Sequence, residues 1–216
     1  MKQTIKSLLI LSVIFVLPNL AIAELSYGLG VGYISSEKTK ESDIFALLAG
    51  SRNKDLDNFS QDNTDIAFRV FASYDYENFL DIEFAYTDYG ENSFSGDKLF
   101  PNASNTTRNY SKAEASGELT GFSITIGPKK QYSNGLIVSG KMGALMWNVN
   151  GEGYKLSETT YTDLSTSSWE ETLDIDDDGV SFLLGVGVSY SHFTLGFERV
   201  SINSSETNLI MLSAKF

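Results

Sequence analysis

Four charged side chains lie on the faces of alternating segments that otherwise carry mainly small residues: Arg69, Glu83, Lys141 and Glu198. Two are cations and two are anions, so their charges sum to zero. If the segments are paired strands, Phe71 lies opposite Glu83, and Arg69 reaches Glu83 on the diagonal. Lys141 and Glu198 lie at similar distances from the short turns beside their own segments. Because an unpaired buried charge is unfavourable, we predict one interior ion-pair network.

Nucleophilic catalysis has little support in the sequence. The chain has no Cys, which excludes disulfides and thiolate metal sites, and His192 is its one histidine. The neighbourhood of this residue, His192-Phe193-Thr194, offers a hydroxyl only as Thr and falls in a short turn. A hydrolase of the Ser, His and carboxylate type needs the three groups within hydrogen-bond reach of one another. We therefore expect no enzymatic activity and no cofactor.

The acidic run of residues 174–179, DIDDDG, begins like a calcium-binding loop. Its carboxylates at alternate positions, Asp174, Asp176 and Asp178, are followed by a glycine, and such a loop can wrap a hard cation. The twelfth position, where a bidentate Glu belongs, is Gly185, and a strand pattern follows where a helix should. We interpret the run as a solvated acidic loop, with these three residues as weak metal candidates.

The first 23 residues have the features of a cleaved secretory signal peptide. Lys2 and Lys6 form a basic start, residues 8–17 form an apolar run, and Ala21-Ile22-Ala23 is a small-residue cleavage site. The formal net charge of the 216-residue chain is −12, which argues against nucleic acid as a partner. No later stretch contains eighteen consecutive apolar residues, so we expect no membrane-spanning helix.

The remaining chain, residues 24–216, alternates apolar with small or polar residues at period two, which is typical of β-strands. Eight segments show the pattern: 25–34, 64–75, 79–89, 117–127, 136–148, 180–190, 193–200 and a last stretch ending at residue 216. Opposite the apolar face stand Gly, Ser and a few charges, whereas a soluble sandwich exposes Lys, Glu and Thr there. Tyrosines gather at segment ends, as in interfacial girdles. We therefore predict an all-β transmembrane barrel with a narrow, filled lumen.

The connections between these segments alternate strictly between short and long. The short ones are turns at residues 76–78, 128–135 and 191–192, and the long ones span about 35–63, 90–116, 149–179 and 201–208. This alternation indicates an eight-stranded antiparallel up-and-down barrel, with turns on one side of the membrane and loops on the other. We expect the long loops outside the cell and the short turns in the periplasm.

Three parts of the chain carry a family resemblance. Residues 68–74 and 81–90 (FRVFASY and DIEFAYTDYG) look like the second hairpin of the outer membrane protein A (OmpA)-like transmembrane barrel family. Residues 138–147 and 185–190 are similar to its fifth and sixth strands. The ending LSAKF resembles its terminal strand signature, which implies that Phe216 faces lipid and serves as an assembly signal. The resemblance covers essentially the whole chain after the signal peptide and implies the outer membrane of a Gram-negative bacterium.

The resemblance also implies a role for the interior charges. The family uses such a buried cluster as a plug or gate, and Glu83 and Lys141 match its charged interior positions. Eight strands leave barely enough interior for side chains, so we favour a packed plug and leave a narrow pore as an alternative. The sequence ends at the barrel, so we expect neither the peptidoglycan-binding domain of outer membrane protein A nor its wall-tethering role.

We expect a non-enzymatic monomer with a structural or surface-interaction role. The implied partners are outer-membrane lipid, lipopolysaccharide and the barrel assembly machinery. The long loops are rich in Asn, Ser, Thr, Tyr and acids, so an adhesin or host-factor binder stays open as an alternative. Divalent cations bridging the acidic run to lipopolysaccharide also stay open. A barrel enzyme that modifies lipid A is the remote alternative.

Overall fold

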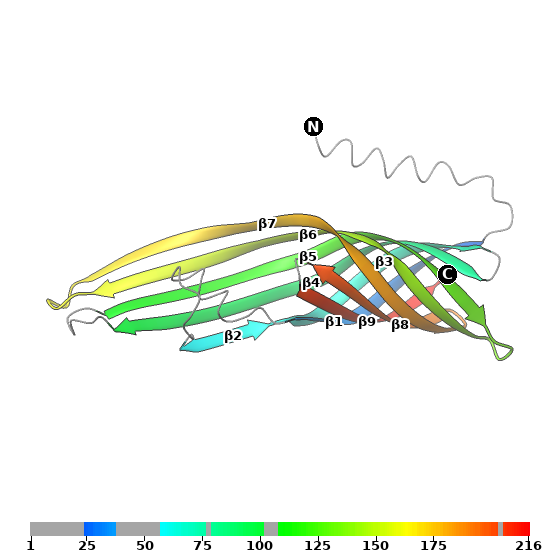
Figure 1. The fold of residues 1–216 in the computed structure, drawn as a ribbon, viewed down its shortest axis with the longest axis horizontal. Helices are drawn as coiled ribbons and strands as arrows, with labels where there is room; N and C mark the ends of the chain where they lie inside the picture. The colour runs from blue at the N-terminus through cyan, green and yellow to red at the C-terminus, as the bar shows by residue number, and fades with distance from the viewer. Residues whose placement is uncertain (1–23, 38–56, 77–78, 102–107, 203–204) are drawn as a thin grey trace, which may run out of the picture.

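The structure is a computed structural model, and it describes residues 24–37, 57–76, 79–101, 108–202 and 205–216 (Figure 1). The signal peptide predicted for residues 1–23 lies outside the described residues, as does most of the first predicted loop. Within the described ranges, no helix is long and apolar enough to cross a membrane.

The described residues form nine antiparallel strands in one sheet: β1 (Glu24–Ser36), β2 (Asn58–Asp62), β3 (Thr64–Tyr76), β4 (Leu80–Pro101), β5 (Arg108–Gln131), β6 (Leu136–Thr160), β7 (Thr166–Tyr190), β8 (Phe193–Ile202) and β9 (Ser205–Lys215). Their order is β2-β4-β3-β1-β9-β8-β7-β6-β5, and β4 also pairs with β5. This last pairing closes eight strands into a ring, while β2 adds to β4 beside it. The predicted eight-stranded antiparallel barrel is therefore confirmed.

Four strands run far beyond their predicted ends. β4, β5, β6 and β7 are 22 to 25 residues long. They occupy most of the ranges 90–116 and 149–179, so the prediction of loops there was wrong. Both faces of these extensions are largely polar, so the period-two hydrophobic signal disappears although continuous pairing with a neighbouring strand satisfies the backbone. In Figure 1 the four arrows continue well past the ends of β1, β8 and β9.

We call this extension the projecting sheet. It comprises β2 and residues 91–101, 108–118, 149–160 and 166–179 of the four long strands. A β-bulge between Asp88 and Glu91 marks where β4 enters it. At this point β4 ends its pairing with β3, at Phe68 opposite Asp88, and β2 takes over further along.

The conformation of the bulge requires a glycine at position 90. Gly90 has a φ of +78°, a left-handed conformation that costs little only for glycine. The Asp65 carboxylate accepts a hydrogen bond from the Glu91 N–H at 2.7 Å, and it lies directly against Gly90. Gly90 and Asp65 thus fix the point at which β4 changes from barrel wall to projecting sheet.

The outward face of the barrel is apolar around its circumference. Leu29, Phe68, Ile124, Phe182 and Leu212 come from five different strands and are between 47% and 60% exposed. Large apolar side chains exposed on every side are unfavourable in water and favourable in lipid. This face is therefore the membrane-facing surface.

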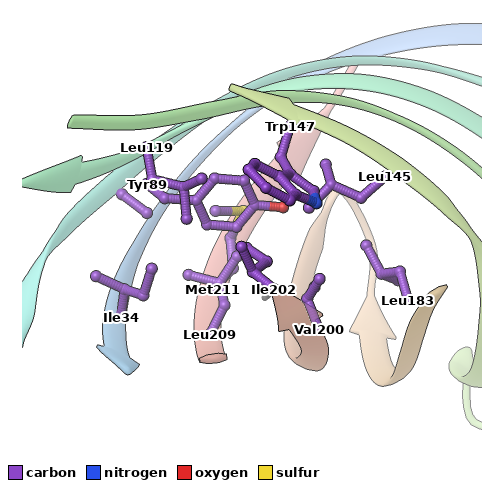
Figure 2. Close-up of a cluster of buried hydrophobic side chains, with 11 residues drawn as sticks. Ile34, Tyr89, Leu119, Leu145, Trp147, Leu183, Val200, Ile202, Leu209 and Met211 are labelled. Carbon is purple, nitrogen blue, oxygen red and sulfur yellow. The ribbon is translucent and has the colours of Figure 1, made fainter. Parts of the chain in front are cut away.

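The interior holds a layer of large apolar side chains that the sequence analysis did not predict. The layer comprises Ile34, Ala67, Tyr89, Leu119, Leu145, Trp147, Leu183, Val200, Ile202, Leu209 and Met211 (Figure 2). The sequence pattern predicts an inward face composed mainly of Gly, Ser and a few charges. In Figure 2, Tyr89 and Trp147 lie at the centre of the group, with side chains from the surrounding strands packed around them. The lumen at this level is a hydrophobic core.

One predicted register was wrong by two residues. Glu83 lies opposite Ser73, and Phe71 lies opposite Ala85. The reason is the position of the turn between β3 and β4. The two strands stay paired as far as Tyr76 opposite Leu80, whereas the predicted turn begins at residue 76. A shift of two residues keeps every side chain on its predicted face, because side chains alternate with period two.

Candidate functional site

The four predicted interior charges meet inside the barrel. Arg69 comes from β3, Glu83 from β4, Lys141 from β6 and Glu198 from β8. The Arg69 guanidinium donates two parallel hydrogen bonds to Glu198, from Nη1 to Oε1 and from Nη2 to Oε2, both at 2.5 Å. Such a bidentate pair fixes geometry as well as charge. It joins two strands across the lumen.

The second cation completes the network. Lys141 Nζ donates to Glu83 Oε1 at 3.0 Å and to Glu198 Oε1 at 2.9 Å. Arg69 Nη1 lies 3.6 Å from Glu83 Oε1, and Arg69 Nε donates to Thr87 Oγ1 at 2.8 Å. The side chains of Arg69 and Glu198 are each only 3% exposed. Each charge therefore has an opposite charge in contact, which a buried ion needs.

A glycine makes room for this network. Gly185 on β7 lies opposite both Lys141 on β6 and Glu198 on β8. A Cβ atom at this position would lie 2.9 Å from Lys141 Cγ and 3.0 Å from Glu198 Cγ. Any larger residue would push the two charged side chains away from their present positions.

A second ionic cluster, which the sequence analysis missed, closes the end of the lumen next to the short turns. Asp75 on β3 contacts Lys129 on β5 at 2.7 Å and Lys215 on β9 at 2.9 Å. All three residues lie within a few positions of a short turn or of the C-terminus. Opposite charges on inward-facing positions close to the short turns would have predicted this cluster from the sequence.

The apolar layer lies directly beyond the four-charge network. Ala67 is two residues from Arg69 along β3, and Val200 is two residues from Glu198 along β8. Leu145 is four residues from Lys141 along β6, and it is fully buried. Side chains two and four residues apart on one strand point to the same face, so these stack above the charges inside the barrel. The lumen is thus filled in consecutive layers: ionic, ionic and apolar.

Comparison with known proteins identifies the family. The model of the OmpA-like transmembrane domain matches residues 23–195. The chain belongs to this family. No curated protein sequence matches it. OmpA-like barrels of this kind lie in the outer membrane of Gram-negative bacteria, and so does this one.

Solved structures of two bacterial surface proteins are among those similar to this OmpA-like barrel. The attachment invasion locus protein Ail of Yersinia pestis is 14% identical, with 90% of this chain and 99% of that chain covered and a TM-score of 0.40. Neisserial surface protein A is 10% identical, with coverage of 89% and 97% and a TM-score of 0.39. Ail has also been solved in complex with the heparin analogue sucrose octasulfate, at 13% identity, 90% and 99% coverage and a TM-score of 0.38.

The predicted assembly residue of the OmpA-like barrel lies at its closing seam. Phe216 is 74% exposed, and its N–H donates to the Tyr27 carbonyl at 2.7 Å. The Tyr27 N–H donates in turn to the Phe216 carbonyl at 3.2 Å. The last residue of the described chain is therefore paired with β1, and its ring lies on the membrane-facing side.

The weak metal candidates of the OmpA-like chain lie on a strand and not in a loop. Asp174, Asp176 and Asp178 are exposed residues of β7. An extended strand separates alternate residues by about 6.6 Å, so it does not wrap them around one cation. Among the described residues, no three His, Cys, Asp or Glu side chains are grouped to hold a metal ion. The prediction of a loop at these residues was wrong.

His192 of the OmpA-like barrel is an exposed residue in the turn between β7 and β8. Its Nδ1 lies 2.9 Å from the Oγ of the adjacent Ser191. Neighbouring residues in one exposed turn do not form the enclosed geometry that an acyl-transfer site requires. Its surroundings therefore offer no support for hydrolytic chemistry.

Proposed function

We propose that this protein is a closed, non-enzymatic barrel whose role is to hold the projecting sheet at the cell surface for interaction with other molecules. The observation that carries the proposal is the contrast between the barrel and the sheet. The barrel interior is filled with side chains, whereas the projecting sheet is long, regular and polar.

The filled interior supports a role without conduction. An eight-stranded barrel has just enough interior for its own side chains. Here the Asp75 cluster, the four-charge network and the apolar layer follow one another along the same lumen. An ion crossing the barrel would have to pass Leu145, Leu183 and Trp147, none of which can replace its hydration shell. The buried charges therefore connect strands across a filled lumen and do not line an open path.

The strand lengths support a role for the projecting sheet. β6 and β7 each have 25 residues, whereas a membrane-spanning strand needs about 9–11. More than half of each strand thus lies outside the hydrocarbon layer. In barrels of this kind the long connections face the outside of the cell, so we place the sheet there.

Two measurements test the proposal. In planar bilayers the purified protein is expected to give no regular conductance steps. Cells displaying the wild-type protein are expected to adhere to a cultured cell monolayer, and adherence is expected to fall when the β4–β5 and β6–β7 hairpins are cut back to the barrel rim. The shortened variant must still migrate as a folded, heat-modifiable band, which provides the control. Regular conductance together with unchanged adherence after shortening would refute the proposal.

The narrow pore remains the second candidate, because ion pairs that meet across a lumen can exchange partners. Arg69 and Lys141 both contact Glu198, so either cation can keep Glu198 paired while the other moves away. The apolar layer opposes it, because rearranging the charges leaves Leu145 and Leu183 in place. Steps in conductance that change on Glu198→Gln would favour the pore.

A further inference from the structure

The outer edge of β7 has no strand beside it along most of the projecting sheet. β6 pairs with β7 over its whole length, from Thr160 opposite Thr166 to Leu136 opposite Tyr190. β8 pairs with β7 only as far as Leu183. Within the described part of the chain, no strand therefore pairs with the other edge of residues 166–182. In Figure 1 this stretch of β7 forms the margin of the projecting sheet.

The backbone of this edge can accept a further strand. The Tyr161 N–H donates to the Ser165 carbonyl, so the odd-numbered residues of β7 exchange hydrogen bonds with β6. The pairing of β6 with β7 continues without a register shift. The even-numbered residues from Thr166 to Phe182 therefore direct their N–H and C=O groups toward the open edge. Such an edge is a template for an added strand.

Two of the usual protections of a free edge, Pro and a β-bulge, are missing here, and the charges that the edge carries are all acidic. Proteins commonly guard open edges with Lys, Pro or a β-bulge. Residues 166–182 contain no Lys, Arg or Pro, and their pairing with β6 has no bulge. At about 3.3 Å per residue, the edge is roughly 55 Å long. A regular edge of this length is suited to binding an extended segment.

The charge of the edge selects the kind of segment. Residues 166–182 carry six acids and no base: Glu170, Glu171, Asp174, Asp176, Asp177 and Asp178. Two copies of this edge pairing with each other would bring like charges side by side, which is destabilising. A second copy of this chain is therefore a poor occupant. An extended segment with cationic side chains can pair with the open backbone groups of β7, and its charges are attracted to the acids of this edge.

We propose that the open edge of β7 binds an extended polypeptide segment with Lys or Arg at alternate positions, by strand addition. The backbone hydrogen bonds supply affinity, and the acids of β7 select and orient the cationic strand. This inference rests on the proposed surface-interaction role of the projecting sheet, and it names the partner chemistry for one edge of it.

A synthetic peptide provides the first test. The probe is a ten-residue peptide of alternating Lys and Thr, labelled for fluorescence anisotropy, with the full-length protein in zwitterionic lipid nanodiscs. We expect saturable binding that weakens as salt rises. The same peptide with every backbone amide N-methylated keeps its charge but loses the N–H donors of both its edges, and we expect at least tenfold weaker binding. Equal binding of the two peptides, or no binding of either, would overturn the proposal.

A pair of variants at one residue provides the second test. Thr172 is even-numbered and lies opposite Tyr154, so Thr172→Pro removes one N–H at the open edge and leaves the hydrogen bonds to β6 intact. We expect Thr172→Pro to weaken binding at least tenfold, whereas Thr172→Val keeps the N–H and is expected to bind like the wild type. Equal binding by all three proteins contradicts strand addition. If Thr172→Pro does not fold, the N-methylated peptide still decides the question, because it needs no variant.

The remaining outcomes separate this inference from the proposed function. If the wild-type protein self-associates and Thr172→Pro abolishes the association, the occupant is a second copy and the inference fails. If the hairpin-shortened protein loses cell adherence while the Lys-Thr peptide binds no part of the wild type, the surface role stands and the edge assignment fails.

Asp174→Asn with Asp176→Asn is expected to reduce the salt dependence of peptide binding.

Discussion

Arg69 and Glu198 form the central contact of the barrel interior. Their bidentate pair is almost fully buried, and Lys141 adds a third charge to Glu198 at 2.9 Å. Removing Glu198 would leave two cations without their main partner in a water-poor lumen. Breaking a buried pair from one side is therefore more damaging than removing both partners.

We predict that Glu198→Ala lowers the free energy of unfolding by about 3–5 kcal/mol. Glu83→Ala is expected to cost less, because Arg69 lies 3.6 Å from Glu83 but 2.5 Å from Glu198. The double variant Arg69→Ala with Glu198→Ala should cost less than the sum of the two single losses. Urea unfolding in lipid vesicles, followed by the folded and unfolded gel bands, measures all three. Additive losses would contradict direct contact between the two residues.

The four residues of this network could be predicted together for a physical reason. Period-two alternation fixes which side of a strand each residue faces, and distance from a short turn fixes its level in the lumen. The contacts themselves could not be predicted. The position of the turn sets the register of β3 with β4. Pairing continues to Tyr76 opposite Leu80, whereas the predicted turn begins at residue 76, and nothing in the local sequence shows this difference of one residue.

At the scale of the strands, the bulge at Gly90 directs β4 into the projecting sheet. Gly90→Ala would force a Cβ atom into Asp65 and would place Ala in a left-handed conformation. We predict a loss of about 1–2 kcal/mol and faster proteolysis of the projecting sheet. Gly140→Ala is the matched control, because a Cβ there meets nothing closer than 4.0 Å. Equal protease resistance of the two variants would show that the bulge does not set the direction of β4.

The Asp57 carboxylate adds two hydrogen bonds between the start of β2 and β4. Asp57 accepts a hydrogen bond from Lys98 Nζ and another from the Leu99 N–H, both at 2.8 Å. These bonds lower the pKa of Asp57 below its ordinary value, and the bond from Lys98 has the largest effect. A lowered pKa in the folded protein means that the contact stabilises above the unfolded pKa and is lost as pH falls through the folded one.

We therefore predict that hydrogen exchange at the Leu99 amide is slow at neutral pH and speeds up, relative to the intrinsic rate, as pH falls below about 4. NMR of the protein in micelles measures this exchange. Asp57→Asn is the control, because it cannot titrate and should remove the pH dependence. An unchanged protection factor down to pH 2 would contradict the contact.

The blurred alternation of residues 144–147 was a signal of the apolar interior. Ala144 and Met146 face lipid while Leu145 and Trp147 face the lumen, so both faces of β6 are apolar there. The same doubling occurs at Phe182-Leu183-Leu184 in β7 and at Leu209-Ile210-Met211 in β9. Where several strands lose their polar face at the same level, the lumen is a hydrophobic core. The polar extensions carried no such signal, because pairing, and not burial, keeps them extended.

At the scale of the whole molecule, closure of the barrel depends on the C-terminal strand. Phe216 pairs with Tyr27 through both backbone groups and exposes its ring to the membrane. We predict that deleting Phe216, or the change Phe216→Asp, lowers the yield of folded protein in the outer membrane severalfold. Phe216→Tyr should keep most of that yield. Unchanged amounts of heat-modifiable, protease-resistant protein after the deletion would argue against a role in assembly.

The central claim is that a closed barrel displays the projecting sheet outside the cell. Ser165 lies in the hairpin at the tip of β6 and β7, and Ser133 lies in the turn between β5 and β6 at the opposite end. Both are exposed, and the chain has no native Cys. Single Ser165→Cys and Ser133→Cys variants should therefore behave differently toward a membrane-impermeant maleimide on intact cells. The account predicts labelling at position 165 and none at 133 until the outer membrane is permeabilised; labelling at 133 alone would contradict it.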